Sequence, residues 1–285
     1  MSDPMAAVDT LKRANDAFYG LRGSVGSLSH AVEILGAESV LRQLAQSTAA
    51  ADAPERPSQR ALIRHAAVTA QIAHRLANGH WLHEDDGRYT PGIVATTGLL
   101  HNLGRIAFSY SLPMESDSLY GFSNNPFPVH GPIQELEQLQ FGIDHAELGS
   151  FMLQHLHFPS EMIEAVRSHR CGVPTTSPRH PSRLSWITGA ACLLAETAGY
   201  GLSNQVSFHH ADLDAAFAIY DREVSLRRGD LEEVRRELSH SPPPDFLAMD
   251  DDEHTHRKDR DAVASARTKT ATIKPRTSTH HPSRN

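Results

Sequence analysis

Residues 59–78, QRALIRHAAVTAQIAHRLAN, carry the clearest secondary-structure pattern in the chain. Apolar side chains recur there at spacings of three and four residues, which is the period of an amphipathic helix. The residues of this apolar face are Leu62, His65, Val68, Ile72 and Leu76. Gly79 follows, a residue typical of helix ends. The segment therefore predicts a long helix whose core-facing side includes one histidine.

The same period continues on both sides of this segment, and strand-like alternation is scarce. Several helix starts carry capping residues, among them Ser27, Thr90 and Asp144. The predicted helices cover 27–35, 37–50, 59–78, 90–100, 133–141, 144–156, 159–169, 183–199, 213–220 and 230–238. Proline, serine and asparagine mark 51–58 and 113–131 as loops. We therefore predict an all-α fold.

Residues 241–285 differ in composition from the rest of the chain. They include three consecutive prolines and the acidic run Asp250–Glu253, with few large apolar side chains. Such a segment cannot bury enough apolar surface to offset the entropy cost of ordering it. We predict a helical domain over 1–225, a terminal helix over 226–240 and a disordered tail over 241–285.

Composition and charge exclude several classes of protein. Of the 285 residues 39% are hydrophobic, enough to form a substantial core. The 34 acidic residues outnumber the 27 basic ones, which argues against bulk nucleic acid as the main partner. No apolar stretch reaches the roughly 18 residues of a membrane span, and residues 1–12 lack the pattern of a secretory signal. With only two cysteines, Cys171 and Cys192, both predicted to be inert, we expect a cytoplasmic protein.

Nineteen histidines are an unusual number for a chain of this length. Four of them lie on the apolar faces or at the ends of four different predicted helices: His65, His101, His145 and His169. Facing helices of a bundle can build a metal site from such residues. A single histidine on an apolar face is more often an ordinary core residue, so a helical adaptor whose four histidines never meet remains an alternative.

Several segments, in order along the chain, carry a family resemblance. They are 14–20, 27–36, 98–105 (GLLHNLGR), 141–149 (FGIDHAELG) and 158–169. Together these segments, within residues 11–199, resemble the HDOD domain, an output-type relative of the HD phosphohydrolases. The resemblance implies a compact multi-helix domain that binds signalling proteins or a small ligand. Catalytic relatives in the superfamily hold a divalent metal ion, so the resemblance also implies a candidate metal site.

The chain departs from the superfamily pattern at the positions that matter for catalysis. The His-Asp pair of the hydrolases reads His101-Asn102, a further expected aspartate is replaced by Ala191, and Arg170 stands for the second of two histidines. An amide is a neutral, weaker ligand that cannot act as a base. Any bound ion is therefore expected to be a single divalent transition metal. Its predicted ligands are His65, His101, Asn102, His145 and His169.

On this basis we expect a non-catalytic signalling or regulatory module that acts through protein or small-ligand binding in bacterial signal transduction. The alternative is a metal-dependent phosphohydrolase acting on cyclic dinucleotides or nucleotides, in which Asp144 or Glu147 replaces the missing ligands. Family members also carry further helices before the segment that matches 14–20. Either the start is misplaced or those helices are missing, and in the second case apolar surface on 27–50 would be uncovered.

Overall fold

The computed structural model describes residues 3–16, 23–41, 56–78, 89–121, 133–169 and 181–201, and six single positions between 218 and 236. The chain divides into two units, Met1–Leu247 and Ala248–Asn285, and every described residue belongs to the first. These residues contain helices and no strand, so the all-α prediction is confirmed. The tail 241–285 and most of the predicted terminal helix 226–240 lie outside the described residues. In the described part, no helix is long and apolar enough to cross a membrane.

The helices follow one another in the order α1 (Pro4–Ala14), α2 (Leu28–Leu35), α4 (Pro57–Asn78), α5 (Pro91–Leu100), α6 (Leu103–Ser111), α7 (Pro113–Leu119), α8 (Ile133–Phe141), α9 (His145–His155), α10 (Ser160–Ser168) and α11 (Arg183–Ala195), with the π-helical turn η3 (Glu196–Tyr200) after α11. Residues 37–41 are also helical. The remainder of the predicted helix 37–50, and nearly all of 213–220, lie outside the described residues.

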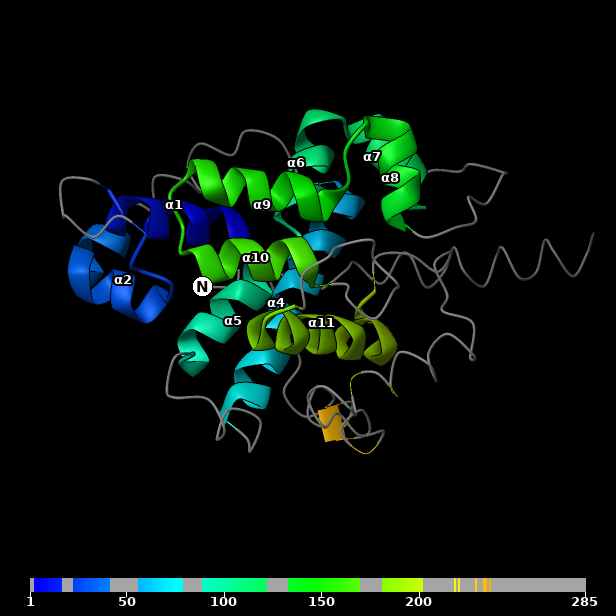
Figure 1. Ribbon diagram of the computed structural model, residues 1–285. Helices are drawn as coiled ribbons and strands as arrows, with labels where there is room; N and C mark the ends of the chain where they lie inside the picture. Colours follow the sequence, from blue (N-terminus) through cyan, green and yellow to red (C-terminus); the bar gives the residue numbers. More distant parts are fainter. Residues whose placement is uncertain are drawn as a thin grey trace, which may run out of the picture. The chain divides into compact units, whose positions relative to one another are not determined.

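Helix α4, which carries the clearest sequence pattern, packs chiefly against α5 and α11. Its predicted apolar face is buried, with Leu62, His65 and Val68 fully so. Helix α10 lies between α9 and α11 and contacts both (Figure 1). These contacts bring helices that are far apart in sequence onto one core, and they set the surroundings of the histidines.

The predicted capping residues begin their helices as expected. Ser27 Oγ accepts a hydrogen bond from the backbone of His30 at 3.3 Å, and Thr90 Oγ1 accepts one from Ile93 at 3.3 Å. Asp144 Oδ1 accepts from the Glu147 backbone at 2.8 Å. Each cap satisfies one backbone N–H of the first helical turn, which has no partner within the helix.

The prediction of a loop over the whole of 113–131 is wrong, because Pro113–Leu119 forms α7. Proline at the first position suits a helix start, and Glu115 lies in the first turn, where negative charge is favourable. Asp117 is buried and forms an ion pair with Arg56 at the start of α4. This long-range contact holds a short segment whose serine- and proline-rich composition resembles that of a loop.

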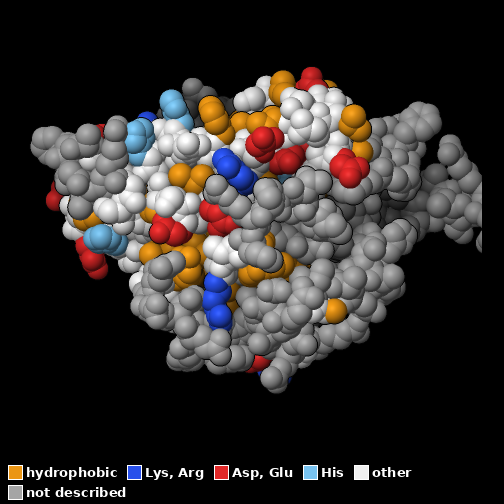
Figure 2. Space-filling view, viewed as in Figure 1, with side chains coloured by type: hydrophobic (Ala, Val, Ile, Leu, Met, Phe, Trp, Pro, Cys, Tyr) orange, Lys and Arg blue, Asp and Glu red, His pale blue; other side chains and the backbone are white. Residues whose placement is uncertain are grey.

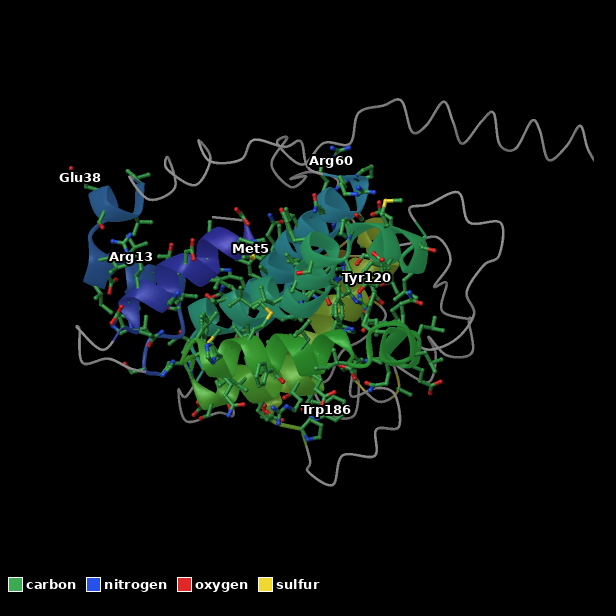
Figure 3. The ribbon with its side chains drawn as sticks, turned by 90° about the horizontal axis from the view of Figure 1, so that it is seen from above. Met5, Arg13, Glu38, Arg60, Tyr120 and Trp186 are labelled. Atoms are coloured by element: carbon green, nitrogen blue, oxygen red, sulfur yellow. The ribbon has the colours of Figure 1, made fainter. Side chains whose placement is uncertain are left out.

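The first helix, α1, was not predicted from the sequence. Asp3 caps it by accepting from the Met5 backbone at 2.9 Å, and α1 contributes Ala7 and Leu11 to the core. At its end Arg13 donates to Ser39 Oγ at 3.3 Å (Figure 3). Helix α2 contacts both α1 and α5, so these two helices cover part of its surface. On the face shown in Figure 2, acidic, basic and apolar side chains of the described residues are interspersed.

Candidate functional site

The four predicted histidines meet in the core. His65 comes from α4, His101 follows α5, His145 begins α9 and His169 follows α10. Their ring centroids are 5.1 Å apart for His65 and His101, 5.1 Å for His101 and His169, and 5.3 Å for His145 and His169. All four side chains are fully buried. The alternative of an adaptor whose histidines never meet is therefore wrong.

Backbone carbonyls set the tautomers of three of these rings. The Nδ1 atoms of His65, His101 and His169 lie 2.8, 2.6 and 2.7 Å from the carbonyl oxygens of Tyr200, Gly98 and Val166 respectively. A carbonyl oxygen only accepts hydrogen bonds, so each Nδ1 carries a hydrogen and donates it. In the neutral ring the lone pair is then on Nε2.

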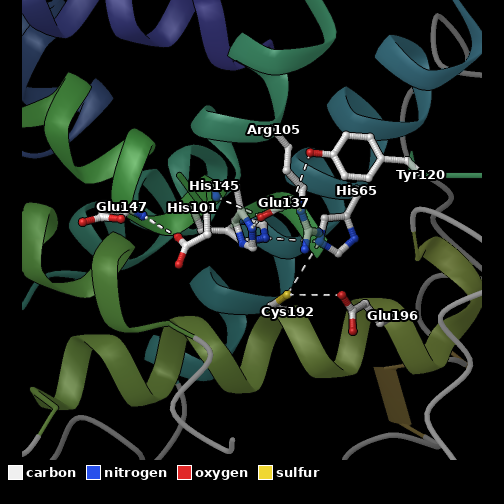
Figure 4. A network of polar contacts seen from close by, with 10 residues as sticks. His65, His101, Arg105, Tyr120, Glu137, His145, Glu147, Cys192 and Glu196 are labelled. Atoms are coloured by element: carbon white, nitrogen blue, oxygen red, sulfur yellow. Dashed lines mark hydrogen bonds and ion pairs between the residues drawn. The ribbon is translucent and has the colours of Figure 1, made fainter. Parts of the chain in front are cut away.

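A thiol lies beside two of the histidines. His65 Nε2 is 3.2 Å from His101 Nε2, and Cys192 Sγ from α11 is 3.7 Å from His65 Nε2 (Figure 4). All three ligand atoms lie within 4.8 Å of one another, and all three residues are buried. Sequence reasoning assigned no functional role to Cys192. Its position directly after Ala191, where a ligand was expected, was the available signal. Cys171 lies outside the described residues.

Asn102, the residue in place of the catalytic aspartate, is fully buried. It precedes α6 without a side-chain capping bond. Neither its Oδ1 nor its Nδ2 atom has a hydrogen-bond partner among the described residues. Burying an amide without partners costs free energy. The Asn102 side chain therefore lowers the stability of the folded domain at the position directly after His101.

His145 is tied to a carboxylate that the sequence analysis missed. Glu137 Oε2 accepts from the His145 backbone at 2.9 Å and also contacts His145 Nδ1. Glu137 Oε1 accepts from Arg105 Nε at 3.0 Å and from Tyr120 Oη at 3.1 Å. Both oxygens of the fully buried Glu137 are thus engaged (Figure 4). The available signal was helical spacing, because Glu137 stands four residues from both Ile133 and Phe141, whereas Glu135 is exposed.

The proposed substitute ligands do not join the cluster. Asp144 caps α9, and Glu147 is exposed, whereas the histidines are buried. Among the described residues, the one group with metal-ligand geometry consists of two histidines and a cysteine and contains no carboxylate. The carboxylate-bound ion of the hydrolases therefore does not fit these residues, since position 102 is an amide and Glu137 is already engaged.

Burial and neighbouring charges shift two pKa values. Burial lowers the pKa of His101 well below 6.5, and the nearby His169, His65 and Arg105 lower it further against the opposing effect of the Gly98 carbonyl. Burial alone would raise the pKa of Glu137, but His145 and Arg105 together hold it far below its usual 4.5. The folded domain thus favours a neutral His101 and an ionised Glu137 at neutral pH.

The neutral His101 predicts pH-dependent stability. Its folded-state pKa is depressed below the unfolded value near 6.5, so the unfolded chain binds more protons and the free energy of unfolding falls as the pH drops below about 6.5. In urea titrations with a chelator, His101→Gln should lose less stability than the wild type between about pH 7 and pH 5. His74→Gln, at an exposed position of α4, should keep the wild-type slope. Equal slopes for His101→Gln and the wild type would contradict this.

Comparisons with known proteins agree with the fold. The HDOD domain family model matches residues 1–171. Among solved structures, the chain is similar to the response regulator MmoQ of Methylococcus capsulatus str. Bath, with 22% identity, a TM-score of 0.58 and coverage of 82% of this chain and 85% of that one. It is also similar to a virulence factor of Campylobacter jejuni subsp. jejuni, with 17% identity, a TM-score of 0.54 and coverage of 83% and 85%. No match was found among curated proteins. The family model spans more than half of the chain, which therefore belongs to the HDOD domain family.

Proposed function

We propose that this HDOD domain is a non-catalytic signalling or regulatory module that acts by binding a protein or a small ligand. The observation that carries the proposal is the buried cluster of four histidines, which has an amide, Asn102, where a hydrolase needs a carboxylate. The similarity of the fold to that of a response regulator supports a role in signal transduction.

The chemistry of phosphoester hydrolysis also supports a non-catalytic role. Hydrolysis in the superfamily requires an ion that polarises the phosphate and lowers the pKa of the attacking water. Among the described residues, the group with metal-ligand geometry, His65, His101 and Cys192, contains no carboxylate to hold a hard ion. The four histidines are also fully buried, so a phosphoester would not reach them without a rearrangement of the surrounding helices.

The test is a turnover assay on the full chain. Purified protein supplied with Mg²⁺, Mn²⁺ or Zn²⁺ is expected to hydrolyse neither cyclic dinucleotides nor a model phosphodiester above the blank. Metal-dependent turnover that His65→Ala or His101→Ala abolishes, and that the exposed control His74→Ala leaves intact, would establish the alternative of a phosphohydrolase.

Asn102→Asp is a useful companion variant. It restores the carboxylate at the position directly after His101. If the scaffold is that of an inactivated hydrolase, this variant should bind Mn²⁺ more tightly than the wild type, because a carboxylate is a stronger ligand than an amide. Unchanged Mn²⁺ binding would contradict the inference that the amide accounts for the missing activity.

A further inference from the structure

We propose that His65, His101 and Cys192 form a binding site for a single borderline-soft divalent ion, for which Zn²⁺ is the natural probe. This set differs from the predicted ligands, because it adds a thiolate and uses only two of the four histidines. Cys192 also lies outside residues 1–171, the part of the chain that the family model matches. The site is therefore inferred from this chain's own geometry.

The distances between the ligand atoms suit one tetrahedral ion. Zn–N bonds of about 2.0–2.1 Å at a tetrahedral angle place two nitrogens about 3.3 Å apart, and a Zn–S bond of about 2.3 Å places sulfur about 3.6 Å from nitrogen. The two Nε2 atoms are 3.2 Å apart, and Cys192 Sγ is 3.7 Å from His65 Nε2. Two of the three distances thus match the tetrahedral spacing without any bound ion, and the third, between Cys192 Sγ and His101 Nε2, is within 4.8 Å.

The orientation of the two rings provides a second, independent argument. His65 and His101 each donate Nδ1–H to a backbone carbonyl, so in the neutral rings both Nε2 lone pairs point into the same small space. With Nδ1–H used in this way, neither neutral ring can donate from Nε2 to the other, so a cation shared by the two atoms, which are 3.2 Å apart, would be favoured there. An Nδ1–H bond to a carbonyl is also the arrangement that orients histidines that ligate metals through Nε2.

Cys192 determines which ions fit. Cys192 is buried, and its sulfur lies 3.8 Å from Glu196 Oε1. Binding replaces the thiol hydrogen with the metal ion, so one proton is released for each ion bound. Imidazole together with thiolate selects Zn²⁺-like ions over Mg²⁺ or Ca²⁺. Three protein ligands leave one tetrahedral position for water or a small anion.

The proposed metal site is independent of the proposed signalling function. A protein that binds an ion without hydrolysing a substrate would be compatible with that function. The first experiment is a Co²⁺ titration of the metal-stripped full chain. We expect one ion per chain, the intense visible absorption of tetrahedral Co²⁺, and a thiolate-to-cobalt charge-transfer band that Zn²⁺ abolishes by displacement. A cobalt complex without the charge-transfer band would overturn the proposal.

Variants identify the ligands. Cys192→Ser, which is nearly isosteric, should remove the charge-transfer band, and both Cys192→Ser and His101→Ala should weaken Zn²⁺ binding by more than about 100-fold, beyond the usual effect of removing an outer-sphere partner. Cys171→Ser and His74→Ala are matched controls that should retain wild-type binding. Loss of the band in Cys171→Ser, or unchanged affinity in Cys192→Ser, would show adventitious binding elsewhere.

A measurement on the wild type tests the ligand set even if the variants fail to fold. X-ray absorption of the Zn²⁺-loaded full chain should show one sulfur neighbour at about 2.3 Å and nitrogen or oxygen neighbours at about 2.0–2.1 Å. A first shell without sulfur would overturn the site. Because neither spectroscopic readout depends on catalysis, this outcome is separate from the turnover assay of the proposed function.

Discussion

Replacing Gly104 with alanine is expected to unfold the domain or to destabilise it by more than about 3 kcal/mol. Gly104 lies in the first turn of α6, and a Cβ atom there would be 2.8 Å from the carbonyl carbon of His145 and closer still to its oxygen. The obstacle is backbone of α9, so no side chain can move aside to relieve it. Helices α6 and α9 would have to separate.

The effect would extend to the histidine cluster, because His145 is both the residue in contact and the first residue of α9. Gly149, one turn further along α9, also packs closely, since a Cβ there would be 3.2 Å from the backbone nitrogen of Gly104. Two glycines thus allow two helices to approach to backbone contact. Circular dichroism and urea denaturation measure the loss of helix and of stability.

Gly229→Ala is the matched control, because a Cβ atom at that position has nothing within 4 Å. Its stability should stay within about 0.5 kcal/mol of the wild type. A Gly104→Ala protein with the wild-type urea midpoint would contradict the close packing of α6 on α9. Loss of stability in both variants to the same degree would point to a general cost of removing glycine.

The parts of the fold that were predictable from the sequence are those that depend on local chemistry. The apolar period of α4 and the capping side chains at Ser27, Thr90 and Asp144 act within one or two helical turns, so the sequence shows them directly. Helix α7 escaped prediction because it depends on a distant partner. Its buried Asp117 pairs with Arg56, 61 positions away in sequence.

The site was predictable only in part, for a similar reason. The predicted helix faces and helix ends singled out all four histidines, and the family resemblance supported the expectation that they form one site. Neither signal could show that Cys192 lies against His65, because that contact joins α4 and α11 across 127 positions. Nor could the sequence reveal the partners of Glu137, since a carboxylate becomes tolerable in a core only when groups such as Arg105 and the His145 backbone surround it.

Replacing Glu137 with alanine should destabilise the domain by about 3–5 kcal/mol. The Arg105 side chain is 2% exposed, and its Nε donates to Glu137 Oε1 at 3.0 Å, so removing the carboxylate leaves a buried cation without its counter-charge. Tyr120 Oη and the His145 backbone would lose an acceptor as well. Urea denaturation at neutral pH measures the effect.

The same carboxylate gives the domain an acid-sensitive stability. The folded-state pKa of Glu137 lies below its usual 4.5, so its contribution is complete above about pH 4.5 and declines as the pH falls further. Glu137→Gln, which cannot ionise, should be less stable than the wild type at neutral pH but should lose less stability on acidification. The difference between the two proteins should therefore narrow below about pH 4.5.

Two further variants separate the buried charge from a general effect of helix α8. Glu135→Gln alters an exposed carboxylate of the same helix and should change stability by less than about 0.5 kcal/mol. Adding Arg105→Met to Glu137→Gln should recover part of the lost stability, because no uncompensated charge then remains in the core. If the double variant loses as much free energy of unfolding as Glu137→Gln and Arg105→Met lose separately when added together, the two residues act independently. The ion pair of α6 and α8 would then have no net role in holding His145 in place.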